Sequence, residues 1–188
     1  MIHYDPAEHI YTREDGTVLP SVTQILAPLK DFRRIPRDIL DRASRFGEAV
    51  HEMVRLEIDD RLDESTLDPH LVPLLAQWRA CREEQGWLLV DADVTVADLS
   101  WGYAGRYDLV CQGKHGLDLI DLKTGRESPA DGPQLAAYAQ CYSFSGRLIN
   151  LYIRSDSWTL VDRTATRGHD YDVFLACLTI HRHLHPVE

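Results

Sequence analysis

The sequence contains no apolar run long enough to cross a membrane, and its first residues, MIHYDPAEHIY, lack the apolar core of a secretory signal peptide. It contains no C-x-x-C pair, and the four cysteines lie 30, 30 and 36 residues apart. This dispersion argues against a zinc site or a disulfide framework, and reduced thiols in a cytoplasmic protein are the simplest interpretation. Repeats, low-complexity linkers and a Walker loop are also missing, so the sequence contains no sign of a repeat array or of an NTP-driven motor.

An overall excess of positive charge is missing as well. The chain has 20 Lys and Arg against 30 Asp and Glu, a net charge of −10. This balance excludes a general nucleic-acid coat protein, which needs clustered basic residues to bind phosphates. The charge is uneven, however, because residues 30–45 hold six basic residues against three acidic ones, whereas residues 48–68 hold eight acidic residues against two. The basic segment is either a local polyanion site or the solvated face of a helix.

The 188 residues, 44% of them hydrophobic, fit one soluble globular domain with a substantial core. We expect a single domain over residues 1–188, with a mainly helical part at 1–86 and the sheet core at 87–188. Periodicity and turn residues predict a hairpin at 9–20, helices at 21–29, 37–60, 69–85, 132–144 and 170–184, and strands at 87–97, 103–112, 116–124, 147–154 and 157–165.

Two charged residues close the apolar segment GLDLIDLKTG. Asp121 and Lys123 flank Leu122, so in a strand both side chains leave the same face while Leu122 points to the other. A short turn joins this strand to the preceding one, so Asp108 in YAGRYD can lie beside Asp121. Neighbouring carboxylates repel unless a proton or cation lies between them, and oxygen ligands suit Mg²⁺ or Mn²⁺. The pattern suits phosphodiester hydrolysis, with Lys123 orienting water or stabilising developing negative charge.

Helical spacing adds further polar residues to this pattern. Gln134 and Tyr138 are four residues apart on the helix after the strand, and Gly47 and His51 are four apart on the long helix upstream. Gly47 would permit close approach of another backbone, and His51 would face the same direction. Taken alone, D-x-K is typical of a surface salt bridge, and a lone helical histidine is typical of an ordinary core or surface position. These residues indicate a site only in combination.

The order of the motifs resembles that of a known family. In chain order they are LPSVTQIL, G-x-x-x-H at 47–51, AGRYD, DLKTG and QLAAYA. This order resembles the RecB-like exonuclease branch of the PD-(D/E)XK nuclease superfamily, and LPSVTQIL resembles a segment of phage-type exonucleases and of the mitochondrial genome-maintenance exonuclease. The resemblance implies an α/β fold in which a central mixed β-sheet is flanked by helices, with a helical N-terminal part.

The resemblance also implies a role for each matching residue. It assigns Mg²⁺ or Mn²⁺ to four ligands: His51, Asp108, Asp121 and the carbonyl group of Leu122. Lys123 would be the catalytic lysine, and Gln134 and Tyr138 would position water and the nucleic-acid backbone.

Three further residues carry two interpretations each. Ser21 and Thr23 match a segment that lies near DNA in relatives, but the competing role of both is helix capping. For Ser21, which has capping-box spacing to Gln24, the two roles fit equally well. Arg106 either contacts a phosphate or is a surface arginine.

Some features depart from the family or stay outside its pattern. Several relatives hold an iron–sulfur cluster with one early and three late cysteines, and the dispersed cysteines of this chain predict no cluster. The histidines in HRHLH, residues 181–185, alternate and so do not share a helix face, which predicts a solvent-exposed tail. Asp118 points away from Asp121 and is expected to be a surface residue.

The function expected is a metal-dependent DNA exonuclease that acts at DNA ends or on single strands, in phage or bacterial recombination, repair or DNA processing. DNA is the expected partner, and a membrane is not. A recombination or replication protein, or further copies of this acidic chain, would help to hold DNA. The alternatives are a catalytically inactive DNA-binding or assembly subunit and a site-specific endonuclease. The complete set of candidate site residues disfavours the first alternative, and the lack of a specificity domain disfavours the second.

Overall fold

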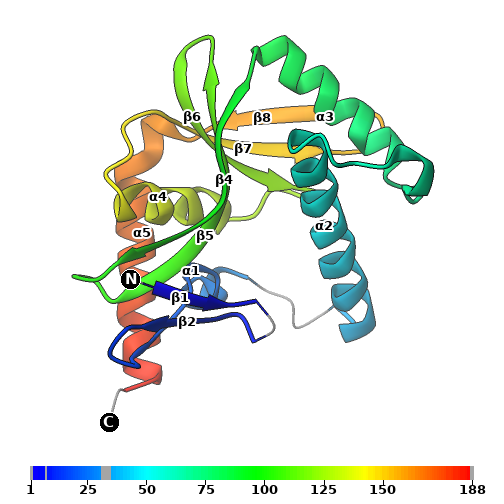
Figure 1. Cartoon of the computed structure of the whole chain (residues 1–188). Helices are drawn as coiled ribbons and strands as arrows, with labels where there is room; N and C mark the ends of the chain where they lie inside the picture. Colours follow the sequence, from blue (N-terminus) through cyan, green and yellow to red (C-terminus); the bar gives the residue numbers. More distant parts are fainter. Residues whose placement is uncertain (1, 7, 31–34, 187–188) are drawn as a thin grey trace.

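The computed structural model describes residues 2–6, 8–30 and 35–186, so residues 31–34 of the basic segment lie outside the described residues. The described residues form two β-sheets with helices around the larger one (Figure 1). The smaller sheet is antiparallel and contains β1 (Ile2–Asp5), β2 (Ile10–Arg13) and β3 (Val18–Leu19). The larger sheet contains, in spatial order, β4 (Leu88–Asp98), β5 (Tyr103–Gly113), β6 (Gly116–Lys123), β7 (Arg147–Ile153) and β8 (Trp158–Asp162).

The helices flank this sheet, so the predicted α/β fold class is confirmed. They are α1 (Val22–Ile25), α2 (Arg37–Ile58), α3 (Val72–Gln85), α4 (Asp131–Cys141) and α5 (Arg167–Leu184), with 3₁₀ turns η1 (Ala27–Leu29), η2 (Glu64–Thr66) and η3 (Thr164–Thr166). Helices α2 and α3 lie on one side of the sheet and α4 and α5 on the other (Figure 1). Among the described residues, no helix is long and apolar enough to cross a lipid bilayer.

The strand order explains how the chain brings distant motifs together. The three strands β4, β5 and β6 form the predicted antiparallel meander. Strand β7 then pairs with β6 in parallel, and α4 forms the crossover that a parallel pair requires. Strand β8 returns antiparallel to β7, which makes the sheet mixed. This order places β6 at the centre of the sheet, between β5 and β7.

Local sequence signals account for several element boundaries. The Ser21 hydroxyl accepts a hydrogen bond from the Gln24 backbone at 3.1 Å, and the Gln24 side chain accepts one from the Ser21 backbone at 2.8 Å, so the predicted capping box is confirmed. Helix α3 ends at Gly86, whose φ of +65° is left-handed and therefore favours glycine. The predicted hairpin turns at Gly16, but β1, which pairs with it, was missed by sequence analysis.

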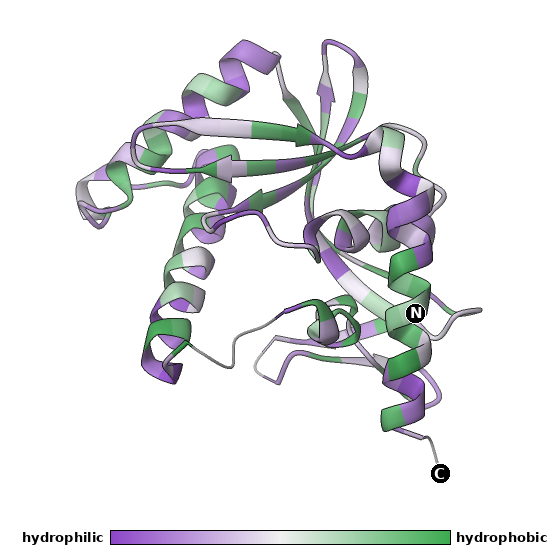
Figure 2. Cartoon of the chain, turned by 180° about the vertical axis from the view of Figure 1, so that it is seen from behind, coloured by the Kyte–Doolittle hydropathy of each residue, from purple (hydrophilic) through white to green (hydrophobic). Residues whose placement is uncertain are grey.

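The core has two halves, one on each face of the sheet. Buried residues of β5, β6 and β7 alternate between a cluster with α1, α4 and α5 and a cluster with α2 and α3. Only the second half of α2 belongs to this core, because its fully buried residues begin at Val50. In Figure 2, hydrophilic and hydrophobic segments alternate along α2, and its first turns stand away from the sheet.

Two expectations from the sequence were wrong. Asp118 is fully buried, because the guanidinium group of Arg147 binds its carboxylate at 2.6 and 2.7 Å and the Trp87 indole donates to it at 2.7 Å. The expectation that the histidines of HRHLH share no helix face was wrong too, because His181 and His185 are four residues apart and their rings lie 4.7 Å from each other, although residues 182–185 are exposed as expected. Both partners of Asp118 are distant in sequence, which is why its spacing alone suggested the surface.

We predict that Asp118→Ala lowers the free energy of unfolding by about 3–5 kcal/mol, because it leaves a partly buried guanidinium and a buried indole N–H without their acceptor. Urea denaturation measures this loss. The matched control is Asp38→Ala, which removes the carboxylate of an exposed aspartate–arginine pair with Arg42 and should change stability by less than about 1 kcal/mol. Equal effects of the two substitutions would contradict the structural role of Asp118.

Candidate active site

The end of β6 carries the charged pair that the sequence singles out. Ile120 and Leu122 are buried against α2 and α3, so Asp121 and Lys123 leave the opposite face, as predicted. The pairing of Leu109 with Ile120 places Asp108 beside Asp121 on the neighbouring strand. The Asp108 carboxylate accepts a hydrogen bond from the backbone N–H of Leu122 at 2.7 Å, which ties the two strands together at the site.

Asp121 is surrounded by hydrogen-bond donors. Its side chain is 4% exposed, and Lys123 Nζ lies 2.8 Å from Oδ2 and 3.1 Å from Oδ1. The Gln134 amide donates to Oδ1 at 3.1 Å and also to the Tyr138 hydroxyl at 3.0 Å, while its carbonyl oxygen accepts from Lys123 at 3.1 Å. The amide nitrogen of Asn150 donates to Oδ2 at 2.9 Å. A buried carboxylate needs such partners, and β6, α4 and β7 supply them.

These surroundings set the ionisation of the cluster. Burial raises the pKa of Asp121 to about 6, although the Lys123 ammonium acts in the opposite direction. Burial alone would lower the pKa of Lys123, but the carboxylates of Asp121 and Asp108 outweigh it and raise that pKa. Burial, reinforced by the Asp121 carboxylate, holds the pKa of Tyr138 well above its ordinary value. Lys123 is therefore a cation and Tyr138 a neutral hydroxyl at neutral pH.

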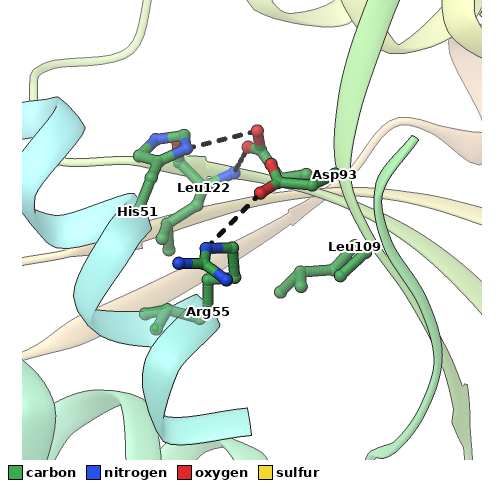
Figure 3. Close-up of a pocket in the computed structure, with 8 residues that line it drawn as sticks. His51, Arg55, Asp93, Leu109 and Leu122 are labelled. Carbon is green, nitrogen blue, oxygen red and sulfur yellow. Dashed lines mark hydrogen bonds and ion pairs between the residues drawn. The ribbon is translucent and has the colours of Figure 1, made fainter. Parts of the chain in front are cut away.

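His51 reaches the site from α2 and contacts two of the predicted metal ligands. Its Nδ1 lies 3.2 Å from Asp108 Oδ1, and its Nε2 lies 3.0 Å from the carbonyl oxygen of Leu122 (Figure 3). Burial alone would lower the pKa of the imidazole, but the Asp108 carboxylate outweighs it and raises that pKa to about 9. His51 also lowers the pKa of Asp108, against the effect of burial. A doubly protonated ring donating to both acceptors fits these contacts.

The donor set fits a divalent cation chemically, since it combines imidazole, two carboxylates and a carbonyl oxygen. Beside His51 and Asp108 lies a cavity of about 10 Å³, close to the space of one water molecule, which Asp93 and Leu122 also line (Figure 3). Asp121 does not line this cavity. Within the described ranges, no three His, Cys, Asp or Glu side chains are grouped closely enough to hold a metal ion. The predicted ligand side chains are therefore not gathered around one point here, and the protonated His51 ring and Lys123 neutralise the two carboxylates.

Two glycines near the site, Gly105 and Gly47, differ in whether the surrounding atoms leave room for a side chain. An added Cβ at Gly105 would lie 2.4 Å from the Tyr138 ring, so this position of AGRYD needs glycine to admit the aromatic ring. At Gly47, by contrast, an added Cβ would lie 3.6 Å from Thr124 Oγ1, which is an ordinary contact. Among the described residues, no other backbone segment comes within 4 Å of this Cβ position, so the close backbone approach that Gly47 would permit is not found.

The predicted DNA-contacting residues have partners within the protein. Ser21 caps α1, and its hydroxyl lies 3.0 Å from that of Thr23. Arg106 binds the Asp93 carboxylate and the Asp93 carbonyl oxygen, each at 3.0 Å, and its guanidinium carbon lies 5.4 Å from the centre of the Tyr4 ring. These contacts hold Arg106 in place, which distinguishes it from a freely moving surface arginine.

Sequence analysis missed one residue of the site and gave no specific role to a nearby lysine. Asn150 is fully buried on β7 and pairs with Asp121 in the strand register. Its only sequence signal is an amide within the apolar run LINLYI. Lys30 follows η1; burial lowers the pKa of its ammonium group, and the charge of Lys123 lowers it further. Lys30 begins the basic segment, where its charge was noted without a specific role.

Comparison with known protein families identifies the superfamily of the chain. Residues 26–148 match the family model of the PD-(D/E)XK nuclease superfamily, which is more than half of the chain. The chain belongs to the PD-(D/E)XK nuclease superfamily. No curated protein matches the chain significantly. A solved structure, the crystal structure of SSO0001, is similar at 17% identity with a TM-score of 0.34, covering 72% of this chain and 70% of that one. The assignment rests on the family match.

We predict that the His51 ring in metal-free protein titrates near pH 9, which NMR of the imidazole resonances measures. Because this pKa lies above the unfolded value of 6.5, the charged ring stabilises the fold fully below pH 6.5, and this contribution is lost as the pH rises through 9. Asp108→Asn should move the midpoint to 6.5 or lower, because burial remains and the carboxylate is gone. A wild-type midpoint at 6.5 would exclude the ion pair.

Proposed function

We propose that the chain is a metal-dependent DNA exonuclease of the RecB-like branch, acting at DNA ends or on single strands in phage or bacterial recombination, repair or DNA processing. The observation that carries this proposal is the arrangement around β6, where Asp108 and Asp121 lie side by side and Lys123 and Gln134 both bind Asp121. Membership of the PD-(D/E)XK nuclease superfamily supports it, because nucleases of this superfamily generally depend on a divalent metal ion.

His51, Asp108, Asp121 and the Leu122 carbonyl would hold the metal ion, Mg²⁺ or Mn²⁺. When bound, the ion would polarise a phosphate oxygen and lower the pKa of a coordinated water. His51 has to release a proton before its nitrogen can act as a ligand, because its ring now donates to Asp108 and Leu122. The chain thus presents a closed, charge-balanced site, and opening of the His51 contacts precedes its use.

The remaining residues would act on water and on the scissile phosphate. Lys123 is held within 3.1 Å of Asp121 and Gln134, where its ammonium group can orient the attacking water or stabilise developing negative charge. The Gln134 amide accepts a hydrogen bond from Lys123 and donates one to the neutral hydroxyl of Tyr138. These two bonds hold the side chains that would form hydrogen bonds with the attacking water. Thr23 and Arg106 would contact the nucleic-acid backbone, alongside the capping residue Ser21. A recombination or replication protein, or further copies of this acidic chain, would help to retain DNA.

We predict that Lys123→Ala lowers the rate of DNA cleavage in Mg²⁺ or Mn²⁺ by at least about 100-fold, because it removes the cation beside the reacting phosphate. Gln134 and Asn150 still donate to Asp121 in this variant, so we expect it to fold. Lys114→Ala is the matched control, because this exposed lysine donates to the Glu84 carbonyl and is not one of the proposed site residues, and the variant should cut like the wild type. Equal activity of both variants would exclude the proposed catalytic lysine.

A second prediction concerns the substrate. With Mn²⁺, linear DNA labelled at the 5′ or 3′ end should be shortened from an end, whereas closed circular DNA of the same sequence stays intact. Gel electrophoresis separates three outcomes. Discrete fragments from circles indicate a site-specific endonuclease. Binding of DNA that survives Asp121→Ala, with no cleavage by the wild type, indicates a catalytically inactive binding or assembly subunit.

A further inference from the structure

Asn150 is a polar residue where the fold favours an apolar one. It is fully buried in the middle of β7, whose neighbouring residues Ile149 and Leu151 belong to the core. A buried amide costs free energy unless its polar atoms are hydrogen-bonded. Here the amide nitrogen donates to Asp121 Oδ2 at 2.9 Å, across the parallel pairing of β6 and β7. The amide is therefore directed at the carboxylate on which the proposed site depends.

Arg163 determines which way this amide points. Its Nε donates to Asn150 Oδ1 at 3.1 Å. A guanidinium group can only donate, so the amide oxygen must face Arg163, and the amide NH₂ must face Asp121. Glu127 accepts a hydrogen bond from the other end of Arg163. The result is an ordered chain of contacts that runs from Glu127 through Arg163 and Asn150 to Asp121.

The two oxygens of Asp121 consequently differ. Oδ2 is bound by Asn150 from within the sheet and by Lys123 at 2.8 Å. Oδ1 is bound by Gln134 and Lys123, each at the longer distance of 3.1 Å. Asn150 is fully buried on a central strand, so it cannot swing away, whereas the Lys123 side chain is 23% exposed. The oxygen with the fixed partner is Oδ2.

We propose that Asn150 is a positioning residue that holds Asp121 Oδ2 so that Oδ1 is presented to the divalent metal ion, and that Arg163 sets the orientation of the Asn150 amide. This inference rests on the proposed function. It adds to the proposed site two positioning residues, Asn150 and Arg163, which would touch neither the metal ion nor the phosphate. Replacing a residue that hydrogen-bonds to a metal-binding side chain commonly lowers metal affinity or activity by about 10–100-fold.

The experiment replaces each member of the chain of contacts and measures metal binding directly. Asn150→Leu keeps the shape of the side chain but removes the donor to Asp121. Arg163→Leu leaves Asn150 in place but frees its amide to turn. Isothermal titration calorimetry with Mn²⁺, without DNA, should show binding weakened by at least about 10-fold in both variants. The Mn²⁺ concentration for half-maximal DNA cleavage should rise by the same factor, while cleavage at saturating Mn²⁺ largely recovers.

Arg147→Lys is the matched control. Arg147 lies on the same strand and pairs with Asp118 just as Asn150 pairs with Asp121, three residues further along the same strand pair. Asp118 lies on the opposite face of β6, so this variant should lose stability and keep the Mn²⁺ affinity of the wild type. Weakened binding in Arg147→Lys as well would mean that Asn150 acts only through stability.

The possible results separate the two proposals. Wild-type Mn²⁺ affinity in Asn150→Leu would overturn the positioning role and leave the nuclease proposal standing. A wild-type protein that neither binds Mn²⁺ nor cuts DNA would instead overturn the proposed function. Should Asn150→Leu fail to fold, Arg163→Leu decides the question, because the Arg163 side chain lies at the edge of the core, 20% exposed.

Discussion

The burial of the Asp121 carboxylate at the centre of the large sheet constrains the rest of the site. A charge in that position is tolerated only with donors around it, and Lys123, Gln134 and Asn150 meet this need from three successive elements. Asp108, on the neighbouring strand β5, forms an ion pair with the protonated imidazole of His51. The cluster is thus close to neutral, with two carboxylates balanced by two cations, and this balance allows it to form within a packed core.

The same charge balance has a consequence for how the cluster would bind a metal ion and a substrate. If a divalent cation took the place of the His51 proton, the local charge would rise by one, because two positive charges would replace one. A phosphodiester carries a single negative charge and would restore neutrality. Substrate binding and metal binding would then support each other electrostatically within a chain whose net charge is −10 and which otherwise repels DNA.

The sequence predicted the order of the elements well. Apolar periodicity indicates whether a segment is a helix or a strand and which face is buried, and turn residues mark where the segment ends. It also predicted that Asp121 and Lys123 share a face, since strand geometry alone requires it. It did not predict Asn150 or the burial of Asp118, because Asn150 meets Asp121, and Arg147 meets Asp118, only through the register of β7 against β6, which tertiary packing sets. A buried polar residue in a strand has no sequence period that reveals its partner.

The parallel pairing of β6 and β7 also bears on the order of folding. Asp121, Lys123, Gln134, Tyr138 and Asn150 all belong to one strand–helix–strand unit, in which Asp121 and Asn150 are only 29 residues apart. His51 comes from 71 residues before Leu122, so its contact has the greatest loop-closure cost and forms late if folding follows chain distance. The carboxylate and its lysine would then meet while the nascent sheet is forming, and docking of α2 would complete the ligand set.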